Sequence, residues 1–280
     1  MAETSHRQSD PTTEPVLVRV LLIAVTGIFL LAFLVLPLGA VLFRVVEAGW
    51  ESFAATLADP DTQSSIRLTL LVAAFAVPFN LVFGLAAAWA IAKFEFRGKT
   101  FFTTLIDLPF SVSPVISGLV YVLLFGADSF LGPKLTALGF PVVFAFPGIF
   151  LATVFVTFPF IARELIPLME TQGKSDEEAA ISLGASGFQT FFRVTLPNVK
   201  WALLYGVLLC NARAMGEFGA VSVISGHVQG RTNTMPLQIE ALYNGYDSAG
   251  AFAVASLLAG LALVTLILRS LLELRLNNDR

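Results

Sequence analysis

The 280-residue chain contains few of the groups that enzymes use for chemistry. Its one cysteine, Cys210, lies in an apolar stretch, so neither a disulfide within the chain nor a cysteine metal cluster is possible. Its two histidines, His6 and His227, lack the companions that a metal site or a catalytic dyad needs. No Gly-x-x-x-x-Gly-Lys-Ser/Thr phosphate loop is present, so any ATP hydrolysis must belong to another chain.

Charge is also scarce, since charged residues make up 13% of the chain and hydrophobic residues 56%. This balance excludes an ordinary soluble domain and indicates a membrane protein. Residues 1–15 are polar and without periodicity, which predicts a flexible tail. The rest predicts six transmembrane helices near 16–43, 68–92, 108–127, 135–162, 201–225 and 248–268. As a helix, 16–43 is about 40 Å long and too long for a cleaved signal, so we expect an uncleaved anchor.

The loops between these segments differ in positive charge, which predicts the orientation of the chain. One set of segments holds twelve Lys and Arg residues: Arg7, Arg19, Lys93, Arg97, Lys99, Arg163, Lys174, Arg193, Lys200, Arg269, Arg275 and Arg280. The alternate set holds four: Arg44, Arg67, Lys134 and Arg231. Both termini and the long polar segment 163–200 are therefore expected in the cytoplasm.

The polar segment 163–200 carries signals for a helical hairpin. Ser175 and Glu178 have the spacing of a capping box, which predicts a short helix that runs to Leu183. Gly184 would allow the left-handed turn that ends this helix. A second short helix would start at the phenylalanines that follow, and Pro197 would end it. Taken alone, such a hairpin is either a docking element or an amphipathic connector on the bilayer surface.

The same segment resembles the signature loop of the permease subunits of bacterial ATP-binding-cassette (ABC) importers. That pattern reads Glu-Ala-Ala, three residues, Gly, nine residues, Ile-x-Leu-Pro. The matching positions here are Glu178, Ala179, Ala180, Gly184, Val194, Leu196 and Pro197, with valine in place of isoleucine. The resemblance implies an all-α membrane protein with the type I ABC importer permease fold, whose cytoplasmic coupling-helix hairpin fits a groove in an ATPase.

Polar side chains within the predicted spans are candidates for function, because they are costly in a bilayer. Arg213 and Glu217 are four residues apart on one helix face and can pair. They are either a mutually neutralising pair at a subunit interface or part of an anion path or gate, since a guanidinium suits sulfate-like groups. The other candidates for that path, each also explicable as helix-packing contacts, are Asn80, Ser111, Ser113 and Ser117.

Three further segments, at 157–167, 213–223 and 226–237, resemble the W-type permease subunit of sulfate/thiosulfate importers. The resemblance implies a multi-pass protein of the bacterial inner membrane that binds no cofactor itself, with ATP and Mg on the partner ATPase. The implied partners are a T-type sulfate permease subunit, a CysA-type ATPase dimer and a periplasmic sulfate/thiosulfate-binding protein, besides membrane lipid. Nucleic acid is not among them.

Alternatives within and outside this class stay open on the sequence. Molybdate and tungstate are tetrahedral dianions like sulfate, and selectivity could reside in the soluble binding protein. An ion-coupled secondary transporter could use Glu217 as a proton carrier, but it would have no use for a docking hairpin. A membrane-embedded hydrolase would need a base beside its nucleophile, and the spans contain no histidine.

Overall fold

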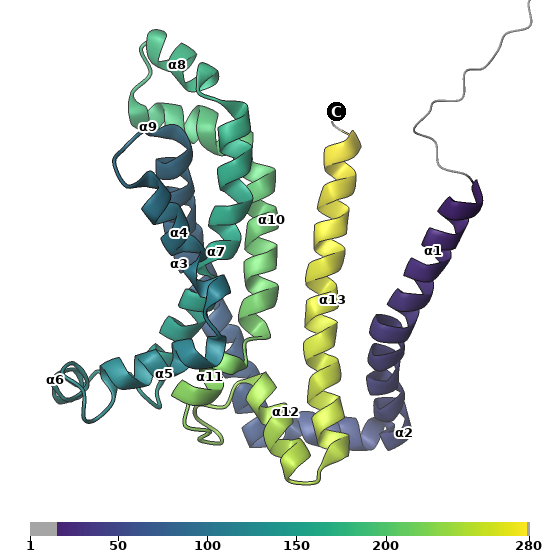
Figure 1. Ribbon diagram of the computed structural model, residues 1–280. Helices are drawn as coiled ribbons and strands as arrows, with labels where there is room; N and C mark the ends of the chain where they lie inside the picture. The colour runs from purple at the N-terminus through teal and green to yellow at the C-terminus, as the bar shows by residue number, and fades with distance from the viewer. Residues whose placement is uncertain (1–15, 279–280) are drawn as a thin grey trace, which may run out of the picture.

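The computed structural model describes residues 16–278, so the predicted tail 1–15 lies outside the described residues. All regular structure in the described part of the chain is helical (Figure 1). The elements are α1 (Val16–Leu30), a π-helical turn η1 (Leu31–Val35), α2 (Leu36–Ala58), α3 (Pro60–Lys93), α4 (Lys99–Ser111), α5 (Pro114–Phe125), α6 (Gly132–Ala137), α7 (Phe146–Gln172), α8 (Ser175–Ser182), α9 (Gly187–Thr190), a second π-helical turn η2 (Phe191–Thr195), α10 (Leu196–Met215), α11 (Gly219–Ile224), α12 (Met235–Asn244) and α13 (Ser248–Asn278).

The core of the molecule is a bundle in which α3, α7 and α10 pack against one another. A Cβ atom at Gly84 of α3 would stand 3.1 Å from the Cβ of Ile161 in α7, and one at Gly206 of α10 would stand 3.2 Å from the Cα of the same residue. The missing side chains thus let both helices approach α7 closely, as small residues do in membrane bundles. α4 packs on α7, whereas α13 contacts α10 and α2.

Several helices in the described residues are long and apolar enough to span a membrane. Four helical segments within 16–278 are long and apolar enough, and a fifth is counted if the bent pair α4–α5 is one span. The four are Val16–Ala58, Pro60–Lys93, Phe146–Gln172 and Ser248–Leu268. α10 is not among them, although it stands beside α7 in the bundle. Six spans remain a prediction that these helices are compatible with.

The third and fourth predicted spans have other bounds in the structure. Segment 108–127 is not one helix, because α4 and α5 meet at an angle of 105°. The cause is Pro114, which disfavours helical geometry at the residue before it, and neither Val112 nor Ser113 is helical. Segment 135–162 begins with the end of α6 and a loop, and its long helix α7 starts only at Phe146.

The fifth predicted span, 201–225, also differs from the structure at both ends. Pro197 was expected to end a helix, and this is wrong: the π-helical turn η2 precedes it and α10 continues through it. A widened turn relieves the clash between a proline ring and the preceding turn of the helix. α10 then ends at Met215 with Gly216 as its C-cap, and α11 is a separate short helix.

The two ends of the bundle differ in structure (Figure 1). One end carries the hairpin of α8 and α9, and the start of α1 and the end of α13 lie toward that same end. The opposite end carries the short helices α11 and α12, and α5 points sideways from the bundle there. The core has one apolar cluster toward each end, and Ile161, Leu165 and Met169 belong to the cluster near the hairpin.

Candidate functional site

The hairpin that the sequence predicts is present, and it lies between α7 and α10. α8 covers Ser175–Ser182, and Gly184 follows with a φ of 90°, the left-handed conformation expected of it. The amides of Gly184 and Ala185 then donate to carbonyls of the last turn of α8, which closes the end of that helix.

The expected capping box at Ser175 and Glu178 is wrong. Lys174 is the N-cap of α8, and its side chain makes no capping hydrogen bond. Ser175 is instead the first residue of the helix, one position too late to cap it. A capping box forms at the second helix of the hairpin, where the Ser186 hydroxyl accepts from the Gln189 amide and the Gln189 side chain accepts from the Ser186 amide.

The tip of the hairpin is an exposed surface with apolar side chains. Glu178 and Ala179 are exposed, and Ala180 is partly covered. The Leu183 side chain at the tip is 90% exposed although it is apolar. Exposed apolar surface that is rimmed by charge is typical of a place where another protein binds.

The remaining signature residues lie where the hairpin returns to the bundle. Val194 and Leu196 are partly buried, and the exposed Pro197 occupies the first turn of α10. They therefore shape the base of the hairpin and not its tip. The base is aromatic as well, since the Trp89 ring of α3 lies 4.8 Å from the ring of Phe191.

Polar contacts fix α8 to the bundle. The Lys93 ammonium at the end of α3 lies 2.9 Å from Oε1 of Glu177, and the Thr195 hydroxyl donates to the same oxygen over 3.1 Å. Burial by itself raises the pKa of Glu177, but the hydrogen bonds from Lys93, its own backbone amide and Thr195 together outweigh it and lower the pKa. The Asn198 amide nitrogen donates to Asp176 over 3.1 Å at the surface.

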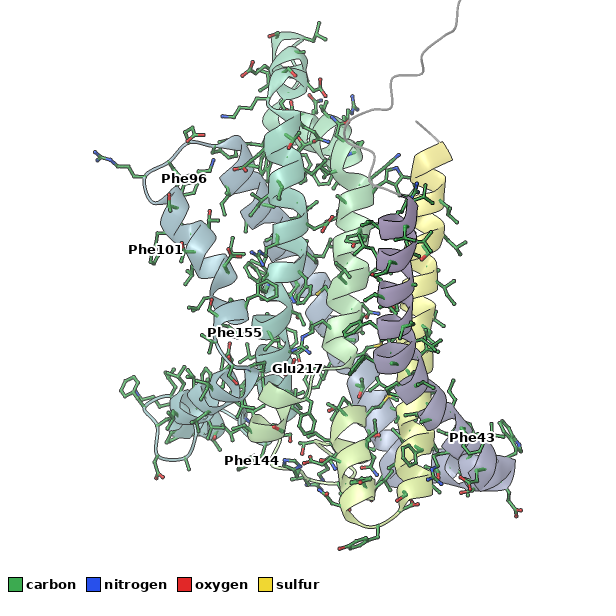
Figure 2. The ribbon with its side chains drawn as sticks, turned by 45° about the vertical axis from the view of Figure 1, so that its right-hand side comes forward. Phe43, Phe96, Phe101, Phe144, Phe155 and Glu217 are labelled. Carbon is green, nitrogen blue, oxygen red and sulfur yellow. The ribbon has the colours of Figure 1, made fainter. Side chains whose placement is uncertain are left out.

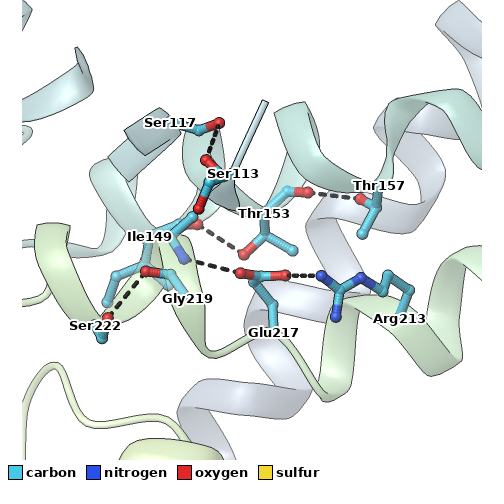
Figure 3. A network of polar contacts seen from close by, with 10 residues as sticks. Ser113, Ser117, Ile149, Thr153, Thr157, Arg213, Glu217, Gly219 and Ser222 are labelled. Atoms are coloured by element: carbon cyan, nitrogen blue, oxygen red, sulfur yellow. Dashed lines mark hydrogen bonds and ion pairs between the residues drawn. The ribbon is translucent and has the colours of Figure 1, made fainter. Parts of the chain in front are cut away.

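A second polar network lies near the end of α10 opposite the hairpin and contains the predicted pair (Figure 2, Figure 3). The Arg213 guanidinium lies 2.9 Å from Oε2 of Glu217, which confirms that the two side chains pair. The contact is an ion pair, and Oε2 of Glu217 has no hydrogen-bond partner among the described residues. The Glu217 side chain is 1% exposed, and its other oxygen accepts from the amide of Ala220, whereas Arg213 is 37% exposed. Glu217 therefore ties the start of α11 to the end of α10.

The other candidates for the anion path are not all in one place. Asn80 is fully buried between α3, α7 and α10, where its amide donates to the Thr157 hydroxyl over 2.7 Å. This hydrogen bond joins two packed helices, and Asn80 has no exposed surface with which to line an anion path. Ser117 is buried and donates to the carbonyl of Ser113. Only Ser111 and Ser113, at the bend between α4 and α5, are exposed.

Two ionic contacts of the structure were not foreseen. Lys93 was read only as a loop charge, although it is a buried partner of α8. Arg163, which was counted in the cytoplasmic loop, lies inside α7 and pairs with Asp107 of α4 over 3.0 Å. The segment between the bundle helices is thus shorter than the predicted 163–200, since α7 runs to Gln172.

The described residues hold no cluster of metal-ligating side chains, and an apolar cavity lies within the bundle. Residues 16–278 contain no group of three or more His, Cys, Asp or Glu side chains that could hold a metal ion. A cavity of about 570 Å³ between α3, α4 and α7 is lined by apolar side chains, among them Phe79, Phe83 and Phe102. A cavity of this kind suits lipid chains or helices and not an anion.

Residues 80–278 match the family model of binding-protein-dependent transport system inner membrane components. The CysW sulfate transport system permease protein of Synechocystis is 47% identical over 94% of this chain and 95% of its own length. The CysW protein of Escherichia coli K12 is 49% identical over 90% of this chain and 87% of its own. The CysT sulfate transport system permease protein of the same strain is 34% identical over 89% of this chain and 90% of its own.

Among solved structures, a chain of a bacterial alginate ABC transporter in complex with a pentasaccharide-bound periplasmic protein superimposes with a TM-score of 0.77. The match covers 93% of this chain and 94% of that one at 17% identity, so it shows the fold alone. The fold is therefore that of an ABC transporter permease. The chain belongs to the family of binding-protein-dependent transport system inner membrane components, and within that family its CysW relatives place it among the W-type permease subunits.

Proposed function

We propose that this chain is a permease subunit of an ATP-driven importer that carries sulfate or thiosulfate from a periplasmic binding protein into the cytoplasm. A T-type permease would be its partner in the membrane, and a CysA-type ATPase dimer would drive transport. The cargo is supported by the relatives, since both the W-type and the T-type proteins are named as sulfate permeases. The observation that carries the ATP-driven mechanism is the exposed hairpin of α8 and α9.

In this proposal the tip of the hairpin binds the ATPase. Glu178 and Ala179 are exposed on α8, and the side chain of Leu183 has almost no cover from its own chain. A small-residue surface allows a partner to approach the backbone of α8 closely, and the left-handed Gly184 keeps the turn tight. Closure of the ATPase dimer on ATP would then move the hairpin, and with it α7 and α10.

The orientation follows from the same assignment. The hairpin must face the cytoplasm, where the ATPase and its ATP are. The start of α1 and the end of α13 lie toward the hairpin end, so we assign both termini to the cytoplasm as well. The excess of Lys and Arg in the segments at this end supports the assignment.

We assign Arg213 to the anion path. Its guanidinium has five N–H donors and forms an ion pair with one carboxylate, that of the fully buried Glu217. The Arg213 side chain remains partly exposed. The donors that Glu217 does not engage can bind a dianion, and the compensation of the Arg213 charge by Glu217 keeps this binding weak enough for release. Ser111 and Ser113 at the bend of α4–α5 are the exposed hydroxyls that could accompany it.

Radiolabelled sulfate uptake by bacteria with and without this chain tests the proposal. We expect uptake to disappear on deletion, to be inhibited by thiosulfate, and to persist with a protonophore when ATP is maintained. Unchanged sulfate uptake, with loss of molybdate uptake instead, would refute the cargo. Uptake that requires the chain but stops when the proton gradient collapses would refute the ATP-driven mechanism.

A further inference from the structure

The side chain of Lys93 connects three elements at the hairpin end of the bundle. Lys93 is the last residue of α3, and its side chain is only 7% exposed. Its ammonium lies 2.9 Å from Oε1 of Glu177 in α8 and also donates to the carbonyl of Gly173, the C-cap of α7. A single buried cation thus contacts α8 and the end of α7 from the end of α3.

The acceptor oxygen of Glu177 is shared with a fourth element. The hydroxyl of Thr195 donates to it over 3.1 Å, and Thr195 is buried in the turn η2 that leads into α10. The Glu177 side chain is 15% exposed, so both members of the ion pair are largely shielded from water. A shielded pair of opposite charges with additional hydrogen bonds holds its geometry more firmly than an exposed pair does.

The rest of α8 is held weakly. None of its residues is buried, so the helix has no apolar anchor in the bundle. The other side-chain contact to the base, between Asp176 and Asn198, is exposed to solvent. The position of α8 relative to α3 therefore depends mainly on Lys93 and Glu177.

We propose that Lys93 is a positioning residue that locks α8 to the ends of α3 and α7. A displacement of the hairpin would then move α3 through this contact. It would also move α7 and α10, which are joined to the hairpin along the chain. The inference rests on the proposed function, in which an ATPase moves the hairpin. Without Lys93, the ATPase could still bind the exposed tip, but α8 would shift without moving α3.

The test compares two lysines at the same end of the bundle. Lys93→Met removes the ammonium and keeps the length of the side chain. Lys99→Met is the matched control, because Lys99 lies nearby and contacts Glu95 and Glu170 at 3.6 Å without reaching α8. Each variant is assembled with its partner permease, ATPase and sulfate-loaded binding protein in proteoliposomes, and ATP hydrolysis and sulfate uptake are measured in the same vesicles.

We expect the ATP hydrolysed per sulfate to rise about fivefold or more in Lys93→Met, with a change of less than about twofold in Lys99→Met. Glu177→Gln, which keeps the side-chain volume, should also raise this ratio. It tests the same ion pair if the complex with Lys93→Met does not assemble. Lys93→Arg should restore part of the coupling. An unchanged ratio in both Lys93→Met and Glu177→Gln would overturn the inference.

Hydrogen exchange in α8 separates this inference from the function on which it rests. The amides of α8 should lose protection in Lys93→Met and keep it in Lys99→Met, whatever the cargo of the complex. If the wild-type complex shows no sulfate-dependent ATP hydrolysis, the proposed function fails, and the exchange result still decides whether Lys93 positions α8. Equal protection of α8 in both variants would refute the lock.

Discussion

Replacing Gly184 with alanine perturbs the hairpin at one backbone position. An added Cβ would meet nothing within 4 Å, so no steric clash arises in this chain. The cost comes from the backbone, because φ at Gly184 is 90° and an L-residue pays about 1–2 kcal/mol in the left-handed region. A penalty of this size changes the population of the native turn by a factor of about 5–30. We therefore expect ATP-driven uptake to fall in Gly184→Ala.

Gly187, also exposed and in the same hairpin, provides the control. A Cβ there also meets nothing within 4 Å, but Gly187 has ordinary helical geometry at the start of α9. Gly187→Ala should transport normally. Gly184→Asn adds a larger side chain that tolerates the left-handed conformation, so it should be less impaired than Gly184→Ala.

The assay is sulfate uptake at matched expression, together with copurification of the ATPase. Equal uptake by Gly184→Ala and Gly187→Ala would refute the backbone argument. If Gly184→Asn is impaired as severely as Gly184→Ala, the constraint at this position is the space that the docked ATPase needs, and the backbone is not the cause.

Three other predictions concern the rest of the molecule. In Gly118→Val, the new Cβ would stand 2.5 Å from the carbonyl oxygen of Ala220, and such overpacking should cost about 1–3 kcal/mol of stability. Gly27→Val is the control, because the space around Gly27 is open, and Gly118→Val should have the lower melting temperature in detergent. Arg213→Gln should destabilise the protein by about 3 kcal/mol, because it leaves the buried carboxylate of Glu217 without its ion-pair partner, whereas Glu217→Gln should cost about 1 kcal/mol. Equal falls in melting temperature for the two variants would contradict this prediction. Because the pKa of Glu177 is lowered from its ordinary 4.5, its contribution to holding α8 is complete above that value and is lost as the pH falls through the lowered pKa. Protection of α8 against hydrogen exchange, corrected for intrinsic rates, should therefore be constant from about pH 8 to about pH 5, and a loss within this range would refute the assignment.

The features that depend on local sequence were predictable. Gly184 ends α8 in the left-handed conformation, as its place after a helix-forming run indicates. Arg213 and Glu217 pair, as their spacing indicates. The placement of Ser175 as a cap failed, because a serine one residue before or after the cap position gives the same local pattern.

The features that depend on contacts far apart in the chain were not predictable. Pro197 reads as a helix stop, yet packing of the helices on both sides stabilises a π-helical turn that accommodates it. Lys93 and Glu177 are separated by the whole of α4–α7, and nothing local distinguishes them from solvated charges. The place of Glu177 in the first turn of α8 indicates only a favourable interaction with the helix dipole, which an acidic residue in any first turn would share.

The bend between α4 and α5 has a consequence for the lipid bilayer itself. α4 has 13 residues and is about 20 Å long, whereas the hydrocarbon core of a bilayer is about 30 Å thick. Because α5 leaves at 105° to α4, it adds almost nothing to this length. A bilayer that contacts this side of the molecule would therefore find no upright helix from this segment over about a third of its hydrocarbon core. Such a bilayer would have to thin to meet α5, and the subunit would then impose a local hydrophobic mismatch on it.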